Sequence, residues 1–389
     1  MDLKRILIIV PSFNSGGTVS SLINFVSLVD KTKYHISVFA ITPTGPNKAF
    51  VAEHCAIVGD GKRQQERHTT SIKSTIRDTV FAVVKSIKKL LEKVSIDISP
   101  ILFRKYARKL DTGEYDYVLA FQEGQATFFG SFFRNGTKVA WVRSEYTRFI
   151  KGANKRNNSY YERYDKIVSV SKAALENFLS ILPQYRDRAY VQYNFLNDDR
   201  IMAMSKEKVG DLWVNDVFTI VTLGRIDPVK RVSEIPRICR ELLDMGLKLR
   251  WIIIGGVAVK SEFDLLKDNL VKYQVKENIE IKGNRPNPYP YLMQSDLLVS
   301  LSKSETFNNT LTEAKILGLP VVTTDYPCAY ESIDNNNEGL VVSFDKVVSA
   351  IANMISDKDN MYSFIKSYLS AYHYDKNKIL QQLYTNILN

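Results

Sequence analysis

The sequence has few residues of the kinds that bind metals or form disulfides. It contains three cysteines and four histidines in 389 residues. The histidines match no catalytic motif, so we expect no histidine base. The cysteines lie far apart and lack the spacing of a metal site, so we interpret them as reduced thiols of a cytoplasmic protein. They are Cys55, Cys239 and Cys328.

Long apolar runs are also missing. Near the N-terminus the only such run is Ile6–Val10, which ends at Pro11. It is too short for the apolar region of a signal peptide, and a membrane-spanning helix needs about 20 apolar residues. We therefore expect neither a signal peptide nor a transmembrane helix.

What is present is the composition of a globular protein, with 45% hydrophobic and 24% charged residues. A chain of 389 residues is long for one core and sufficient for two domains. Residues 1–200 hold 31 Lys and Arg against 19 Asp and Glu, a net charge of +12, and residues 201–389 hold 22 against 23, a net charge of −1. Only the basic half is therefore expected to meet an acidic surface.

The most informative stretch is 296–325, which predicts a strand, a loop, a helix and a second strand. An apolar run at 297–301 predicts a buried strand, and the helix at 310–317 stops at Gly318, which suits a left-handed backbone. We expect Asn309 or Thr310 to cap the helix. In parallel sheets, ligands bind at the carboxyl ends of strands, where this loop lies.

Two carboxylates mark this loop and indicate its ligand. Glu305 lies within the loop and Glu313 lies one turn into the helix. An ionised carboxylate accepts hydrogen bonds from a diol, while the first amides of a helix suit phosphate. The pattern favours a ligand with both groups, such as a nucleotide sugar, over an ordinary acidic loop.

A second strand end, after 217–223, carries two cations. Gly224 and Arg225 follow the strand, and Lys230 precedes a helix. Arginine binds phosphate as a fork and lysine as a point charge, so the segment is suited to clamp a diphosphate. The alternative is a salt-bridged turn.

Three strand ends of the N-terminal half carry further candidates. Gly16 and Gly17 join a strand to a helix, where a phosphate can approach the backbone, although a plain tight turn is equally compatible. Glu123 follows the strand 116–121. Arg143 follows the strand 138–142 and is suited to an acidic or phosphorylated acceptor or to the donor, with a surface salt bridge as the alternative.

The stretch 62–109 holds 13 Lys and Arg and four acids. Within it, residues 72–94 place apolar residues at helical spacing and cations largely on the opposite face. Such a helix can lie on an anionic membrane surface, or it can be an ordinary surface helix with its apolar stripe on the core.

The segment from Glu305 to Glu313, followed by Gly-Leu-Pro-Val-Val, resembles the Glu-x7-Glu signature of retaining glycosyltransferases of family 4. Thr306 and Asn308 stand where that family more often has glycine. Relatives also commonly have histidine at the position of Arg143. The resemblance implies the GT-B fold, which has two doubly wound, Rossmann-like α/β domains facing across a cleft. The domains expected are 1–196 with the crossover helix 372–389, a linker at 197–216, and a donor-binding domain at 217–371.

The resemblance also implies an activity, transfer of a sugar from a nucleotide diphosphate sugar, in particular a UDP-sugar, to a hydroxyl of a glycan or lipid-linked acceptor. The enzyme would be a hexosyltransferase with Glu305, Arg225 and Lys230 as catalytic residues and Glu123 and Arg143 on the acceptor side. The donor-binding residues implied are Gly16, Gly17, Arg225, Lys230, Gly283, Asn284, Glu305, Thr306, Phe307, Asn308, Asn309, Thr310 and Glu313.

The implied setting is bacterial surface polysaccharide biosynthesis in the cytoplasm, at the inner face of the membrane. No cofactor and no metal are expected, since no Asp-x-Asp pair stands at a strand end and GT-B enzymes generally bind diphosphate without metal. The rival interpretation is a non-catalytic, glycosyltransferase-like subunit that binds a glycan or protein. Nucleic acid is not expected as a partner, because the basic half contains no nucleic-acid-binding motif.

Overall fold

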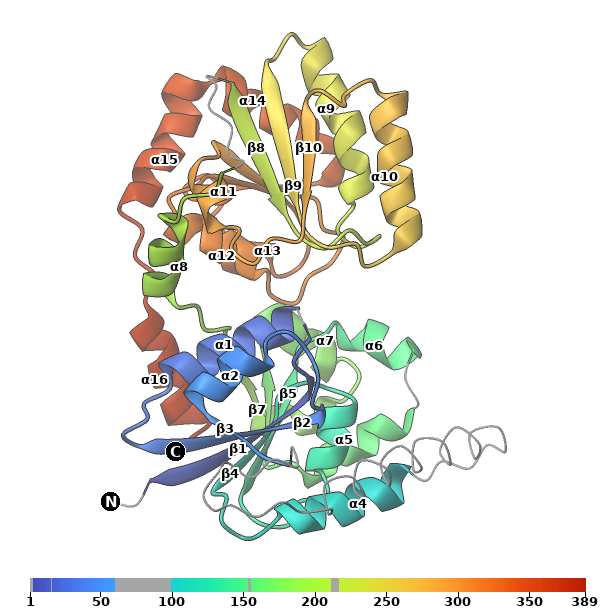
Figure 1. Cartoon of the computed structure of the whole chain (residues 1–389), viewed down its shortest axis with the longest axis vertical. Helices are drawn as coiled ribbons and strands as arrows, with labels where there is room; N and C mark the ends of the chain where they lie inside the picture. Colours follow the sequence, from blue (N-terminus) through green and yellow to red (C-terminus); the bar gives the residue numbers. More distant parts are fainter. Residues whose placement is uncertain (1–2, 15, 60–98, 153–154, 211–216) are drawn as a thin grey trace. The chain divides into compact units, whose positions relative to one another are not determined.

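The computed structural model describes residues 3–14, 16–59, 99–152, 155–210 and 217–389. The helix expected at 72–94 and residues 211–216 of the expected linker lie outside these ranges. The chain divides into two compact units (Figure 1). Unit 1 comprises Met1–Ser169, Phe178–Val191 and Gln382–Asn389, and unit 2 comprises Val170–Asn177 and Gln192–Gln381. Residues 372–381, expected with the N-terminal domain, are thus grouped with unit 2.

Unit 1 is built on a parallel sheet. Its strand order in the described part of the chain is β3-β2-β1-β4-β5-β6-β7. The order reverses between β1 and β4, so the carboxyl ends of these two strands flank the position where α/β sheets bind ligands. The strands are β1 Lys4–Ser12, β2 Tyr34–Thr42, β3 Ala56–Ile57, β4 Tyr117–Ala120, β5 Thr137–Val142, β6 Lys166–Ser169 and β7 Ala189–Val191.

Helices connect these parallel strands, as parallel pairing requires. Their apolar residues and those of the strands are buried together. Phe25, Phe121 and Trp141 illustrate the packing, with the Phe25 ring 5.6 Å from the Phe121 ring and 6.3 Å from the Trp141 ring. The helices are α1 Gly17–Leu28, α2 Lys48–His54, α4 Ser99–Leu110, α5 Gln125–Gly130 and α6 Tyr146–Gly152, while α7 Lys172–Leu179 and α16 Lys376–Asn386 have residues in both units.

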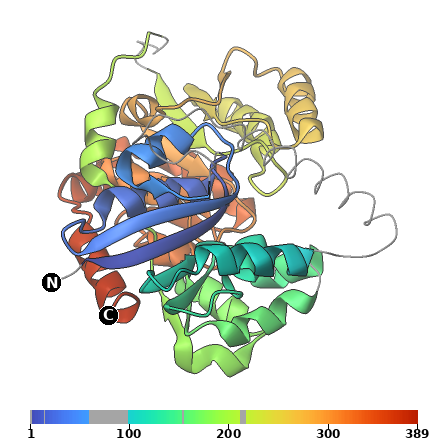
Figure 2. The ribbon, with the colours of Figure 1, turned by 60° about the horizontal axis from the view of Figure 1, so that its bottom comes forward.

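The C-terminus is fixed to the first strands of unit 1, which run side by side in blue in Figure 2. The Tyr384 ring stacks on the Tyr34 ring at 5.6 Å, and the Tyr34 hydroxyl donates to the Leu388 carbonyl at 3.0 Å. The Lys166 ammonium donates to the Asn386 carbonyl at 2.9 Å. The last residues therefore complete unit 1.

Unit 2 contains a second parallel sheet, with the order β10-β9-β8-β11-β12-β13 among the described residues. Its order reverses between β8 and β11, the two strands after which the sequence predicts phosphate and hydroxyl ligands. The strands are β8 Phe218–Leu223, β9 Leu249–Ile254, β10 Ile279–Gly283, β11 Leu297–Ser300, β12 Val321–Thr324 and β13 Gly339–Val342.

Both faces of this sheet are covered, so its strands are apolar throughout. One apolar core includes Trp251 and Leu266, and another includes Leu298 and Leu311. The helices are α8 Asp198–Ser205, α9 Ile235–Asp244, α10 Lys260–Lys272, α11 Tyr289–Met293, α12 Asn309–Ile316, α13 Ala329–Ser332, α14 Val347–Ser356 and α15 Ser363–Ser370.

The segment expected as a linker at 197–216 is not irregular throughout, because it contains α8. Asn197 caps this helix, its side-chain oxygen accepting from the Arg200 amide at 3.0 Å. The Lys376 ammonium forms ion pairs with Asp198, at 2.7 Å, and with Asp199. Polar residues that resemble a linker thus form a capped helix that is fixed by two ion pairs.

Candidate functional site

The loop after β8 holds the first two cations of the candidate site. Its organiser is Asp227, which is 7% exposed. One Asp227 oxygen accepts from the amides of Val229 and Lys230, both at 3.0 Å, and the other lies 3.1 Å from the Arg225 guanidinium. The Arg225 side chain remains 66% exposed, so the loop is rigid at Asp227 and open at its arginine.

The loops after β8, β9 and β10 approach each other closely through glycine. Gly255 has φ 155°, and a Cβ on it would lie 1.8 Å from the Gly224 carbonyl oxygen. The Gly255 amide also donates to the Gly283 carbonyl at 2.8 Å. A side chain at 255 would separate these loops, so glycine is required there.

Lys230 and Glu305 form an ion pair that joins the two strand ends at the switch point. The Lys230 ammonium contacts Glu305 Oε1, and the side chains are only 20% and 16% exposed. The Ser302 hydroxyl donates to the same carboxylate oxygen at 2.8 Å. The structure thus brings together one cation and one carboxylate that the sequence places 75 residues apart.

Glu313 lies on the first turns of α12 with a tyrosine beside it. The Tyr289 hydroxyl is 3.4 Å from Glu313 Oε1. The Glu313 side chain is partly accessible to solvent, but the surrounding protein removes enough water to raise its pKa to about 7. The Tyr289 hydrogen bond opposes this pKa shift. Near neutral pH the carboxyl is therefore poised between its two protonation states.

The loop between the carboxylates differs from the expectation at its cap. Helix α12 begins at Asn309, so the cap position is Asn308, and the Asn308 side chain makes no capping hydrogen bond. The prediction that Asn309 or Thr310 caps the helix is therefore wrong. The Asn309 side chain instead accepts from the Asn194 amide at 3.0 Å. The Phe307 ring lies 6.0 Å from the Tyr193 ring.

The far end of α12 matches the expectation. Gly318 has φ 68°, the left-handed conformation predicted for it. The following strand β12 pairs with β11 in parallel. The strand, loop, helix and strand predicted at 296–325 are thus present.

In unit 1, the predicted glycine turn lies at the carboxyl end of β1. Gly16 has φ 147°, and the amides of Val19 and Ser20 bond its carbonyl as α1 begins. A Cβ built on Gly16 or on Gly17 would meet nothing within 4 Å. Their backbone is therefore accessible, as close contact with a ligand would require.

Glu123 and Arg143 lie at neighbouring strand ends of unit 1 and interact. Glu123 is 4% exposed, accepts from the Arg143 amide at 2.7 Å, and accepts from the Ser144 hydroxyl. The Arg143 guanidinium lies 4.0 Å from the Phe121 ring centre, and its Nε donates to the Phe121 carbonyl at 2.9 Å. Burial lowers the pKa of Arg143 to about 9, while Glu123 opposes that shift. The arginine is thus held against a ring, and Glu123 supports the loop that follows β5.

Sequence reasoning missed four residues that position this site. Asp227 could have been found, because Asp before Pro is typical of a turn in which the carboxylate binds amides two residues on. Tyr289, Ser302 and Asn194 meet their partners only through the fold, and no local pattern indicates them. Of the remaining predicted donor residues, Gly283 ends β10, Asn284 follows it, and Thr306 lies in the loop after β11.

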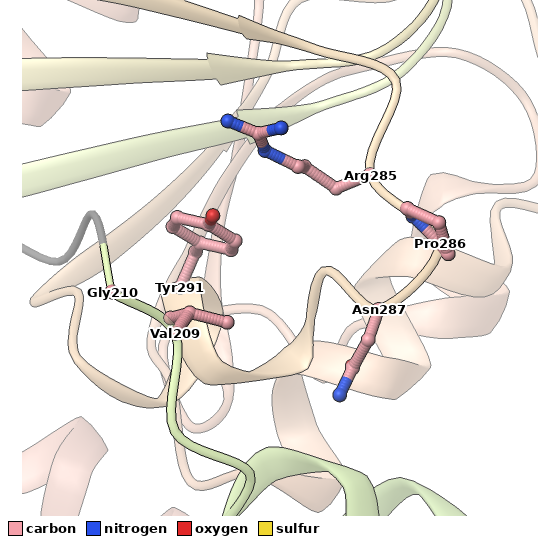
Figure 3. A pocket seen from close by; sticks show the side chains of 6 residues that line it. All are labelled: Val209, Gly210, Arg285, Pro286, Asn287 and Tyr291. Atoms are coloured by element: carbon pink, nitrogen blue, oxygen red, sulfur yellow. The ribbon is translucent and has the colours of Figure 1, made fainter.

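A separate pocket of about 500 Å³ is lined in part by the loop after β10. Figure 3 shows the Arg285 side chain extending from this loop toward the Tyr291 ring. Asn287 ties the loop to the region of α8 by donating to the Met204 carbonyl at 2.8 Å. The lining shares no residue with the Glu305–Glu313 loop, and consists of Val209, Gly210, Arg285, Pro286, Asn287 and Tyr291.

Two features are absent from the described ranges. No group of three or more His, Cys, Asp or Glu residues there could hold a metal ion. No helix there is both long enough and apolar enough to cross a bilayer.

Most of unit 2 matches a known protein family. Residues 205–368 match the family described as glycosyl transferases group 1. An uncharacterized glycosyltransferase of Methanocaldococcus jannaschii is 26% identical over 208 residues, 49% of each chain. A Campylobacter jejuni N-acetylgalactosaminyltransferase, whose name gives a diphospho-undecaprenol-linked sugar as acceptor, is 25% identical over 186 residues, 48% of each chain. The aligned part of the chain spans about half the length of these relatives.

Solved structures match over nearly the whole chain. HepE of Anabaena, crystallised with UDP, has a TM-score of 0.71 and 17% identity, covering 97% of this chain and 98% of its own. TarM of Staphylococcus aureus has a TM-score of 0.71 and 14% identity, covering 99% of both chains. With the two parallel α/β units, these neighbours identify the fold as GT-B, as predicted. The matching family and the relatives named above are glycosyltransferases.

Proposed function

We propose that the chain is a retaining glycosyltransferase of family 4 that transfers a sugar from a UDP-sugar to a hydroxyl of a lipid-linked or free glycan. The observation that carries the proposal is the pairing of Lys230 with Glu305 at the switch point of unit 2, with Arg225 on the same loop as Lys230 and Glu313 on the adjoining helix α12. Cations there suit a diphosphate, and carboxylates suit sugar and ribose hydroxyls.

The names of similar proteins support a UDP-sugar as the donor and surface polysaccharide assembly as the setting. HepE was crystallised with UDP-glucose, and a Staphylococcus aureus relative is named for capsular polysaccharide biosynthesis. The Campylobacter relative is named for a lipid-linked acceptor. We extend these to this chain as a UDP-sugar donor and a cytoplasmic role in surface polysaccharide assembly.

In the proposed reaction, the bond from the sugar anomeric carbon to the diphosphate breaks and UDP leaves. A bond from the acceptor oxygen to the same carbon forms on the same face, and the acceptor proton passes to the departing phosphate. Arg225 and Lys230 stabilise the negative charge on that phosphate. Each is assigned about 3–4 kcal/mol, the loss measured for one preorganised donor to a developing oxyanion.

The carboxylates have different roles in this proposal. Glu313 accepts hydrogen bonds from the ribose diol, with Tyr289 holding the carboxyl in place. Glu305 accepts from the sugar hydroxyls and, through its ion pair, sets the position of Lys230 before the donor arrives. Arg143, held on the Phe121 ring, contributes to the acceptor side. No metal is needed, because the cations supply the positive charge.

The test is product analysis with a water-soluble polyprenyl diphosphate sugar as acceptor and a panel of UDP-sugars. We expect one UDP-sugar to give a glycoside with the anomeric configuration of the donor, and Lys230→Ala to lower kcat at least about a hundredfold. A product of inverted configuration would contradict retention. A wild-type protein that binds UDP but forms no product with any donor would favour the non-catalytic subunit.

A further inference from the structure

Asn308 turns its side chain into the protein, beneath the loop that carries Glu305. The residue is 4% exposed. Its amide nitrogen donates to the Ser300 hydroxyl at 3.2 Å and to the Tyr326 hydroxyl at 3.1 Å. The side chain of the cap residue of α12 therefore bonds downward to the sheet and leaves the helix amides uncapped.

Tyr326 is the second member of this network and lies just beyond β12. It is 3% exposed, and its hydroxyl also accepts from the Thr323 hydroxyl at 3.3 Å. Ser300 ends β11 and Thr323 lies on β12. The Ser300 and Thr323 hydroxyls and the Tyr326 phenol thus fasten the loop to the ends of two adjacent strands.

The same network extends to the ion pair of the candidate site. The Ser300 hydroxyl is 3.5 Å from the Ser302 hydroxyl, which donates to Glu305 Oε1 at 2.8 Å. The Thr324 hydroxyl bonds the Ser302 carbonyl, and the Cys328 thiol lies 3.2 Å from the Glu305 carbonyl oxygen. A displacement of Asn308 would therefore move two things together. One is the backbone of Glu305, and the other is Ser302, which donates a hydrogen bond to the Glu305 carboxylate.

We propose that Asn308 and Tyr326 are positioning residues for the donor, fixing the Glu305–Asn309 loop in its binding conformation before the nucleotide sugar arrives. The inference rests on the proposed function and adds residues to it. Asn308 has an ordinary extended backbone, φ −93° and ψ 92°, so the conformation does not select the residue type. The side-chain amide is what selects asparagine, because a buried amide needs hydrogen-bond partners and Asn308 has them in this loop conformation.

If the network only stabilised the fold, its loss would lower Tm without weakening donor binding. One substitution distinguishes this possibility from a role in positioning the donor. Tyr326→Phe removes a single hydroxyl at nearly constant volume. Tyr362→Phe is the matched control, because Tyr362 is 7% exposed in the same unit, and its hydroxyl is 3.4 Å from Asp296 Oδ1, among residues of the other core. Both substitutions are expected to lower Tm. Only Tyr326→Phe is expected to weaken donor binding.

The measurement is the Kd for UDP by isothermal titration, with KM and kcat for the UDP-sugar that the wild type uses. For Tyr326→Phe we expect Kd and KM to rise about tenfold, the factor given by 1.4 kcal/mol, while kcat stays within about twofold. Asn308→Ala should raise Kd similarly. The double variant should bind about as weakly as either single one, since both act through one network.

Equal Kd values for Tyr326→Phe and the wild type, with the same loss of Tm as in Tyr362→Phe, would overturn the inference and leave the proposed function standing. A wild type that binds no nucleotide would overturn the proposed function itself. Additive losses in the double variant would contradict a common network.

Discussion

At the scale of single residues, Arg231 shows how a local conformation limits what a cation can do. Its backbone is left-handed, with φ 50° and ψ 32°. Its guanidinium lies 4.2 Å from the Phe344 ring centre. Arg231 directly follows Lys230 in the loop after β8. The left-handed backbone suits glycine at this position, and the arginine side chain that is present contacts an aromatic ring.

This conformation predicts an unusual order of stability. Arg231→Ala loses the ring contact but keeps a left-handed Cβ, whereas Arg231→Gly loses the contact and removes the strain. Because a left-handed backbone costs an ordinary residue about 1–2 kcal/mol, the glycine variant should be the more stable of the two by about 1 kcal/mol. Urea unfolding of both variants measures this difference. An alanine variant that equals or exceeds the glycine variant would show that the position is not strained.

Glu313 predicts a pH dependence of stability. Its pKa rises from an ordinary value of 4.5 to about 7 through burial, so the folded state holds the proton more tightly than the unfolded state. The contribution of Glu313 to stability is therefore complete below about pH 4.5 and is lost as pH rises through about 7. Glu313→Gln removes this loss, so the variant should gain stability relative to wild type between pH 5 and pH 8, by about 2–3 kcal/mol.

Thermal unfolding of wild type and Glu313→Gln at the two pH values tests this expectation. Glu305→Gln is the comparison, because that carboxylate is paired with Lys230 and its replacement should cost stability at both pH values. A difference between Glu313→Gln and wild type that stays constant with pH would contradict the raised pKa.

At the scale of helices and strands, the sequence predicted the elements that depend on hydrophobic periodicity and on turn chemistry. Apolar runs predicted β8 and β11, and Gly318 predicted the end of α12. The helix within the expected linker was missed because Asp198 and Asp199 resemble a polar connection until Lys376 pairs with them. The partners of the Glu305 loop were missed because they come from distant segments, and hydrogen bonds of that kind leave no local pattern.

One of those partners predicts an energetic coupling between two elements. Asn194, 8% exposed, lies just after the chain enters unit 2 and bonds Asn309 at the start of α12. In a double-mutant cycle, Asn194→Ala and Asn309→Ala should show a coupling of about 0.5–1.5 kcal/mol in the free energy of unfolding. Urea unfolding measures it.

Asn287→Ala with Asn309→Ala provides the control cycle, because the Asn287 side chain bonds Met204 and Glu207 instead. That pair should be additive. Additivity of the Asn194 and Asn309 pair would mean that the bond contributes nothing to the position of α12.

At the scale of the whole molecule, the uneven charge predicts a basic surface on unit 1. The helix expected at 72–94 lies outside the described residues, but α4 continues the same basic stretch. Its exposed side chains include Ile101, which is 69% exposed, together with Arg104, Lys105, Arg108 and Lys109. Four exposed cations beside an apolar residue suit the surface of an anionic membrane, where a lipid-linked acceptor would be found.

Replacing these four cations by Gln should weaken binding to vesicles that contain anionic lipid. At about 1 kcal/mol for each cation near such a surface, the loss is expected to exceed a hundredfold at low salt. Vesicle co-sedimentation measures it. The matched control replaces four exposed lysines of unit 2, Lys260, Lys267, Lys272 and Lys276, and should bind normally. Equal losses in both variants would indicate a general charge effect.

Under the proposed function, unit 2 binds a nucleotide diphosphate at its switch point. The most direct measurement is thermal stabilisation of the whole protein by UDP, GDP and their sugars, on wild type and on Glu313→Ala. A ligand at 100 times its Kd adds about 2.7 kcal/mol. We predict a rise in Tm with UDP and one UDP-sugar that is lost in Glu313→Ala. No rise with any nucleotide, or an equal rise in the variant, would contradict a nucleotide site at Glu313.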